Sequence, residues 1–120
     1  MIKILIVDAQ AMVRKGLRMR LATEIDMAIV GEASDGMEAE RVMRETNPDV
    51  VILDTELPKR DAFTTARSLR EANPRVDIIL LSLRGDPGLR LQAQRVGARA
   101  FLEKQEGVEK LLEAIRQIQV

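Results

Sequence analysis

Short runs of Ile, Val and Leu recur along the chain, and each is followed by a segment with helical periodicity. Hydrophobicity within the runs is continuous rather than alternating, which is typical of strands buried on both faces of a parallel sheet. The predicted strands are 3–7 (KILIV), 28–33 (AIVGEA), 50–53 (VVIL), 77–81 (DIILL) and 100–102 (AFL). Parallel strands need crossover connections, so the intervening segments are expected to be helices on both faces of the sheet.

The segments between the runs carry apolar residues at helical spacing. Val13, Leu17 and Leu21 are spaced by four and predict a helix after the first strand. The last segment has one apolar face, formed by Val108, Leu111, Leu112, Ile115 and Ile118. Helix starts and stops are indicated by SDG at 34–36, NPD at 47–49 and NPR at 73–75. We therefore predict an α/β fold in which residues 1–120 form one domain of five strand–helix units around a doubly wound parallel sheet.

Composition excludes several kinds of chemistry. The chain has no cysteine and no histidine, which excludes disulfides, thiol nucleophiles and imidazole metal sites. It has 19 basic and 19 acidic residues and only two aromatic side chains, so neither charge nor base stacking favours nucleic-acid binding. No apolar run approaches the roughly twenty residues of a transmembrane helix, and no signal peptide precedes the first strand. We expect a cytoplasmic protein that binds neither nucleic acid nor membrane through this domain.

Polar residues stand at or just after the ends of four predicted strands, at Asp8, Asp54, Ser82 and Lys104. Since the carboxyl ends of parallel strands meet at one edge of an open sheet, we expect these side chains to lie close together. Any one of them alone is better explained as an ordinary loop residue. Together, two carboxylates, a hydroxyl and an ammonium suit phosphoryl transfer, which needs a nucleophile, a ligand for a divalent cation and contacts to the phosphoryl oxygens.

The chain resembles the receiver domain of bacterial two-component response regulators at all five predicted strands. The matching stretches are KILIVD, IVGEASDG, PDVVILD, IILLS, GARAFLEK and LLEAI. The second and fifth of these look most like the branch in which a helix-turn-helix DNA-binding output domain follows the receiver. The resemblance implies a flavodoxin-like fold with strand order 2-1-3-4-5. It also implies a domain that is not a turnover enzyme, binds Mg²⁺, and receives its phosphoryl group from a histidine kinase or a small phosphodonor.

Carried over residue by residue, the resemblance makes Asp54 the phosphoacceptor. Ser82 and Lys104 would contact the phosphoryl group. Phe101 would be the aromatic partner of Ser82 in a conformational switch, although its ring is explained equally well as core filler. The surface that switches would be the face of the fourth helix, fifth strand and fifth helix, and the resemblance allows a homodimer through the same face.

The resemblance fails at the residue after Asp8. The family usually has two acids at the end of the first strand, and the second is generally the direct Mg²⁺ ligand. Here that residue is Ala9, which cannot coordinate a cation. We predict that the metal ligands are Asp8, Asp54 and Glu56, with Glu56 partly compensating for Ala9; the alternative is that Glu56 is a solvent-facing loop acid. Leu83 is a further departure, because a small residue is usual after the hydroxyl residue.

Two functions remain open on the sequence alone. One is a phosphorylation switch centred on Asp54. The other is a degenerate receiver that acts as a phosphorylation-independent interaction module because Ala9 disables metal binding. A flavin-binding protein of the same fold is disfavoured, since the loop DAQAMVRKG is not rich in Gly, Ser or Thr and the chain has no Trp or Tyr. Basic residues of the first helix, including Arg14 and Arg18, offer a charged docking face for a kinase or, more simply, a solvated surface.

Overall fold

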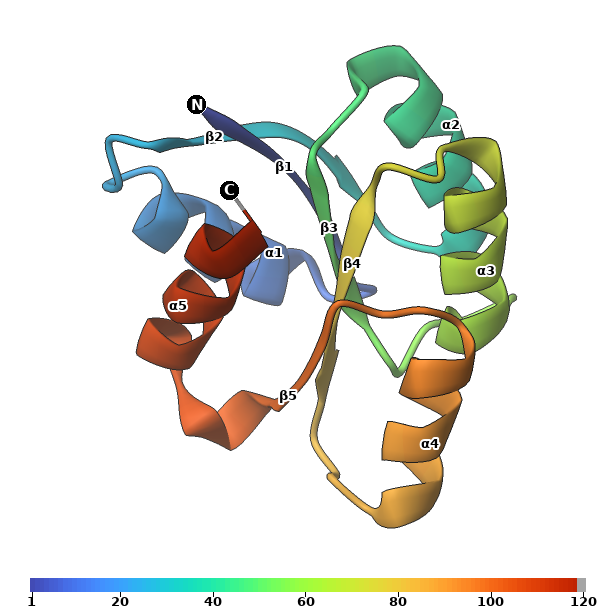
Figure 1. The fold of residues 1–120 in the computed structure, drawn as a ribbon. Coiled ribbons are helices and arrows are strands. Elements are labelled where there is room, and N and C mark those ends of the chain that lie inside the picture. The colour runs from blue at the N-terminus through green and yellow to red at the C-terminus, as the bar shows by residue number, and fades with distance from the viewer. Residues whose placement is uncertain (119–120) are drawn as a thin grey trace.

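The computed structural model describes residues 1–118 as five parallel strands in a single sheet, in the order β2-β1-β3-β4-β5. This confirms the predicted flavodoxin-like α/β fold and its strand order (Figure 1). The strands are β1 (Ile2–Val7), β2 (Met27–Ala33), β3 (Val50–Asp54), β4 (Asp77–Ser82) and β5 (Ala100–Glu103). The predicted strands were right to within one residue at every end, and β3 and β4 extend to include Asp54 and Ser82 themselves.

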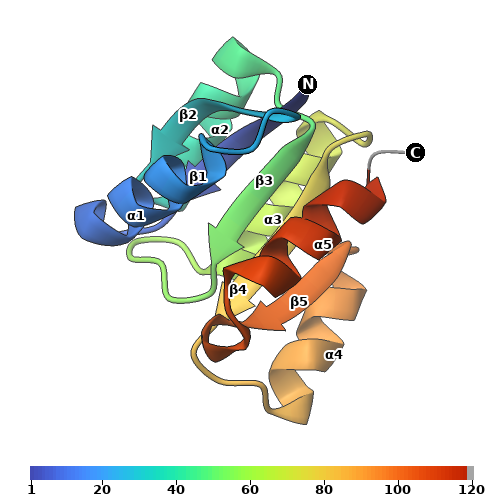
Figure 2. The same ribbon diagram turned by 90° about the vertical axis from the view of Figure 1, so that its left-hand side faces the viewer.

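The helices cover both faces of the sheet, as the crossover connections require. Helices α1 and α5 lie on one face, and α2, α3 and α4 lie on the other (Figures 1 and 2). They are α1 (Ala11–Leu21), α2 (Gly36–Thr46), α3 (Ala62–Ala72), α4 (Pro87–Arg95) and α5 (Val108–Ile118), with a short 3₁₀ helix, η1 (Lys104–Glu106), after β5. Within residues 1–118, no helix has the length and hydrophobicity needed to cross a membrane.

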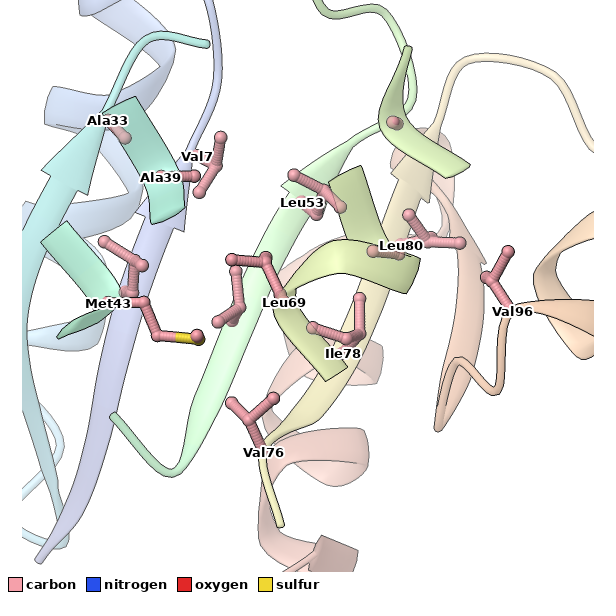
Figure 3. Close-up of a cluster of buried hydrophobic side chains, with 14 of the residues drawn as sticks. Val7, Ala33, Ala39, Met43, Leu53, Leu69, Val76, Ile78, Leu80 and Val96 are labelled. Atoms are coloured by element: carbon pink, nitrogen blue, oxygen red, sulfur yellow. The ribbon is translucent and has the colours of Figure 1, made fainter. Parts of the chain in front are cut away.

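The core is divided by the sheet into two layers. Ile4 and Ile6 of β1 pack beneath α1 and α5, whereas Leu5 and Val7 point to the other side and join the layer beneath α2 and α3. Figure 3 shows part of this second layer, where Val7, Leu53 and Leu69 lie among side chains from the strands and helices. A central strand that supplies both layers needs apolar residues at consecutive positions, which explains the continuous hydrophobicity of the run.

Three helices begin with an aspartate cap. Asp35, Asp61 and Asp86 each accept a hydrogen bond from the backbone N–H three residues later, at the starts of α2, α3 and α4 respectively. Such side chains satisfy amide groups that a helix leaves unpaired at its amino end. Helix α1 differs, because the side chain of its N-cap residue, Gln10, accepts no hydrogen bond from the first turn. The carboxylate nearest to that helix end is that of Asp8, and its contacts belong to the site described below.

Strand β2 contains an irregularity in its pairing with β1. Ile4 pairs with Ile29, but the next residue, Leu5, pairs with Gly31, so the ladder skips Val30. A bulge of this kind changes the alternation of side chains between the two faces of a sheet. Ile29 therefore lies on the α1 side, whereas Gly31 faces α2, where an added Cβ would lie 2.6 Å from Val42 Cγ1.

Candidate functional site

The carboxyl edge of the sheet gathers charged groups that are largely removed from solvent. Asp8 and Asp54 are 3% and 6% exposed, and Ser82 is 1% exposed. The Lys104 ammonium lies 3.1 Å from Asp54 Oδ1 and 3.5 Å from Asp8 Oδ2. The expectation that residues from the ends of β1, β3 and β5 meet at this edge is thus met by a buried pair of carboxylates that share one lysine.

Asp54 is the less well satisfied of the two carboxylates. Within residues 1–118 its Oδ1 atom has no partner with hydrogen-bond geometry, although the Lys104 ammonium lies at the ion-pair distance of 3.1 Å. Burial raises the pKa of the Asp54 carboxyl, and the negative charge of Asp8 raises it further. The Lys104 ammonium and the backbone N–H of Glu56 oppose this rise in the pKa without cancelling it. An oxygen atom that is buried and free of hydrogen bonds is available to a ligand or a reaction partner.

Asp8 is held in place from three sides. Its Oδ1 accepts a hydrogen bond of 2.9 Å from the Gln10 N–H, and its Oδ2 faces Lys104. Its backbone carbonyl accepts a hydrogen bond of 2.6 Å from Arg14 Nη1. Asp8 therefore fixes the start of α1 as well as the lysine. Its neighbour Ala9 is exposed and adds no ligand atom to the site.

Arg14 is committed to contacts inside the domain. Its side chain is 18% exposed, and its Nε atom donates to Glu32 at 3.3 Å in addition to the contact with the Asp8 carbonyl. Arg18 pairs with the same glutamate but is 44% exposed. Of the two arginines predicted as a docking face on the first helix, Arg18 is thus the one that a partner protein could reach.

The Ser82 hydroxyl makes no hydrogen bond with Asp54 among residues 1–118. Its hydroxyl oxygen accepts a hydrogen bond of 3.1 Å from the Arg84 N–H, in the loop that leads to α4. The following residue, Leu83, is 62% exposed at the same edge of the sheet. The hydroxyl is therefore close to the site but engaged with its own loop.

The side chains of Phe101 and Glu56 make no hydrogen bond or ion pair with Asp8, Asp54 or Lys104 among residues 1–118. The half-buried Phe101 ring packs against the core layer beneath α2, α3 and α4, with the Arg90 guanidinium 5.0 Å from its centroid. The Glu56 side chain is exposed. No three acidic side chains within residues 1–118 are grouped closely enough to hold a metal ion. Metal ligation by the Glu56 carboxylate and switching by Phe101 both stay predictions.

Two basic residues in the loop after Asp54 form ion pairs that the sequence does not predict. Lys59 and Arg60, in the loop between β3 and α3, pair with Asp35 at 3.4 Å and with Glu40 at 2.8 Å. These ion pairs tie the loop that follows Asp54 to helix α2. The partners are 24 and 20 residues apart, so no local spacing pattern reveals them. The backbone of Lys59 has a positive φ of 70°, which is uncommon for a residue other than glycine. The sequence gives no indication of this conformation.

The family model described as "Response regulator receiver domain" matches residues 4–116. The chain belongs to this family. The receiver domain is 38% identical over 110 residues to the uncharacterized transcriptional regulatory protein YhcZ of Bacillus subtilis, covering 92% of this chain and 51% of that protein. It is 31% identical over 115 residues to the chemotaxis protein CheY of Listeria monocytogenes, covering 96% of both chains.

Solved structures agree with this assignment. A two-component response regulator of the LuxR family from Aurantimonas superposes on the receiver domain with a TM-score of 0.92, at 31% identity, covering 97% of this chain and 83% of that one. CheY of Borrelia burgdorferi, solved in a complex with CheX, BeF₃ and Mg²⁺, gives a TM-score of 0.89 at 28% identity, covering 99% and 90%. The chain spans about half the length of YhcZ and of the response regulator GacA of Pseudomonas aeruginosa.

Proposed function

We propose that this receiver domain is a phosphorylation switch, in which Asp54 accepts a phosphoryl group from a histidine kinase or a small phosphodonor. The observation that carries the proposal is the buried Asp54 Oδ1 atom, which accepts no hydrogen bond within residues 1–118 and has an ammonium 3.1 Å away. This oxygen attacks phosphorus as the bond from phosphorus to the donor breaks, which gives an acyl phosphate. Lys104 then pairs with the phosphoryl oxygens, where charge accumulates.

Magnesium binding belongs to the same proposal. Receiver domains generally bind Mg²⁺, and this ion is typically held by one or two carboxylates together with water and phosphate oxygens. The two buried carboxylates fit that requirement, so Asp8, Asp54 and the backbone carbonyl of Glu56 are the groups we assign to it. The ion would offset the negative charge that the phosphoryl group brings to the two carboxylates. We keep the exposed Glu56 carboxylate as a predicted outer ligand that partly replaces the acid missing at Ala9.

The switch would begin at Ser82. When its hydroxyl leaves the Arg84 N–H for a phosphoryl oxygen, the loop to α4 must change shape, and the face of α4, β5 and α5 changes with it. The partners proposed for this face are a second copy of the receiver and a DNA-binding output domain in a longer protein. The domain would act in the cytoplasm, as is typical of the family, and it would modify itself rather than turn over a substrate.

The alternative is a degenerate receiver that binds partners without phosphate. Ala9 favours it, together with the absence of a three-acid cluster within residues 1–118. The two hypotheses differ in whether the carboxylate pair is sufficient for phosphoryl transfer.

Treatment with acetyl phosphate, with and without Mg²⁺, followed by intact-mass measurement, separates the two functions. The wild-type chain should gain one phosphoryl group in the presence of Mg²⁺, and Asp54→Asn should gain none. Ala9→Asp should reach the same yield at severalfold lower Mg²⁺, because it restores a direct ligand. A wild-type chain that gains no mass, beside an Ala9→Asp chain that does, would establish the degenerate receiver instead.

A further inference from the structure

Arg90 of α4 contacts three segments of the chain at once. Its Nε atom donates a hydrogen bond of 3.1 Å to the carbonyl of Gly85, in the loop between β4 and α4. Its Nη2 atom donates to Glu103 Oε2 at 3.1 Å, at the end of β5. Its Cζ atom lies 5.0 Å from the centroid of the Phe101 ring, which is close enough for a cation–π interaction. One guanidinium group thus joins α4, the β4–α4 loop and β5.

The groups that Arg90 joins are neighbours of the site residues in sequence and in the sheet. Glu103 pairs with Ser82 in the ladder between β4 and β5, and it directly precedes Lys104. Gly85 follows Ser82 by three residues. The Glu103 carboxylate lies against Gly85 so closely that an added Cβ would stand 2.4 Å from Glu103 Cδ. The partners of Arg90 are therefore directly connected to Ser82 and Lys104 through the chain and the β4–β5 ladder.

We propose that Arg90 is a latch that holds Phe101 and the β4–α4 loop in the unphosphorylated arrangement. The inference rests on the proposed function for its trigger, which is the movement of Ser82 toward the phosphoryl group. Once the loop moves, the Gly85 carbonyl leaves Arg90 Nε, and the guanidinium loses one of the two acceptors that fix its orientation over the ring. The Phe101 ring is then free to leave its place in the groove between α4 and β5, which Arg90, Leu91 and Phe101 help to line.

Arginine suits this role because its donors stand in a rigid planar fork. Nε and Nη2 point to two different acceptors while the flat face of the group covers an aromatic ring. Because these contacts belong to one state only, the latch biases the equilibrium toward that state. Its removal should shift the equilibrium toward the phosphorylated arrangement by roughly two- to fivefold, the factor that corresponds to one partly exposed cation–π contact.

The test uses fluorine NMR of the chain labelled with 4-fluorophenylalanine. The chain has two phenylalanines, so the spectrum has two resonances, and Phe63→Leu assigns them. In the unphosphorylated protein, Arg90→Gln should move the Phe101 resonance toward the position that it takes in wild type with beryllofluoride and Mg²⁺, and leave the Phe63 resonance in place. The apparent affinity for beryllofluoride should rise by the same roughly two- to fivefold.

Arg95→Gln is the matched control, because Arg95 is an exposed arginine of the same helix with none of the contacts made by Arg90. It should leave the Phe101 resonance where it is in wild type; the Phe63 resonance does not serve in this control, because Arg95 and Phe63 line the same pocket. A Phe101 resonance that is the same in Arg90→Gln as in wild type overturns the latch. A Phe101 resonance that shifts equally in Arg90→Gln and in Arg95→Gln overturns it as well. A wild-type protein that fails to bind beryllofluoride contradicts the proposed function and the trigger of the latch, whereas a Phe101 resonance that moves in Arg90→Gln but not in Arg95→Gln still establishes that Arg90 holds the ring.

Discussion

Two groups of carboxylates lie at opposite ends of the sheet and differ in how their charge is balanced. At the carboxyl edge, the buried Asp8 and Asp54 share the single cation of Lys104. At the amino edge, Glu24 and Asp26 are bound by Arg116, with 2.5 Å from its Nη2 to Glu24 Oε1 and 3.0 Å from its Nε to Asp26 Oδ2. We call this second group, which also contains Arg20, the Arg116 network.

The pKa of Asp54 and the pKa values of the acids in the Arg116 network are shifted in opposite directions. Burial raises the pKa of Asp54, whereas hydrogen bonds from Arg116 lower the pKa of Glu24 and of Asp26. In the Arg116 network, Glu24 accepts hydrogen bonds from two arginines, because Arg20 also donates to it at 2.8 Å. The site has one cation too few for its carboxylates. At the carboxyl edge a buried oxygen is left without a hydrogen bond within residues 1–118, at a cost in stability, whereas the ion pairs of the amino edge fasten α1 to α5.

The largest effect that would sharpen the comparison is expected from Lys104→Met. Removal of the ammonium leaves two buried carboxylates with no cation, which should lower the free energy of unfolding by about 2–3 kcal/mol at neutral pH. Urea unfolding followed by circular dichroism measures it, since the chain has no Trp or Tyr for fluorescence. Lys110→Met is the control, because the exposed Lys110 pairs with the exposed Glu113 and should change stability by less than about 0.5 kcal/mol. Equal losses in the two variants would show that the lysine of the site is no more important than one at the surface.

Asp54→Asn should raise the free energy of unfolding, which is the opposite of the effect expected for Lys104→Met. The folded-state pKa of Asp54 is raised, so the stability that its protonation confers is present below the unfolded-state pKa and is lost as pH rises through the folded-state pKa. Asparagine does not titrate, and the variant should be more stable than wild type by about 1 kcal/mol at neutral pH. The difference should shrink as the solution is acidified through the folded-state pKa of Asp54. Unfolding curves at a series of pH values test this, and a variant less stable than wild type at neutral pH would remove the contrast between the two edges.

The smallest effect is expected from Arg116→Gln, because the Arg116 network is exposed. Glu24 and Asp26 have lowered pKa values, so their contribution to stability is present above their unfolded-state pKa values and is lost as pH falls through the folded-state values. The variant should therefore be less stable than wild type at neutral pH and equal to it in strong acid. High salt should reduce the difference, since exposed ion pairs are screened.

Arg44→Gln is the matched control for the Arg116 network. Arg44 is an exposed arginine in the last turn of α2, as Arg116 is in the last turn of α5. Its replacement should leave the salt and pH dependence of unfolding as in wild type. The same dependence in both variants would mean that the network adds nothing beyond the favourable placement of a cation at the end of a helix.

Much of this site follows from patterns along the chain, because topology decides it. Once the apolar runs predict a parallel sheet, the residues at the ends of the strands must share an edge, and Asp8, Asp54 and Lys104 are found in contact there. The hydroxyl of Ser82 illustrates the limit. Its position follows from β4, but its hydrogen bond with the Arg84 N–H depends on the conformation of a loop that no repeat or spacing describes.

Side-chain contacts between distant residues could not be predicted in the same way. The meeting of Arg90 with Glu103 depends on the rotamers of two long side chains on separate elements. The exposure of Glu56 depends on the course of the loop after β3. Binary patterns of apolar and polar residues carry no information on such choices, because the residues involved are polar and lie at the surface.

The bulge in β2 leaves this strand with a spare residue. Strand β1 has 6 residues and β2 has 7, and the ladder between them skips Val30. A chain that lacked Val30 could pair without interruption and still present Gly31 to α2 and Glu32 to the arginines of α1. Loss of one residue from 31–33, beyond the bulge, would instead turn the side chains of the residues after it to the opposite face of the sheet. Strand β2 can therefore lose one residue at Val30 with the least disturbance to the contact between Glu32 and Arg14. Through Arg14, the contact with the Asp8 carbonyl is also preserved.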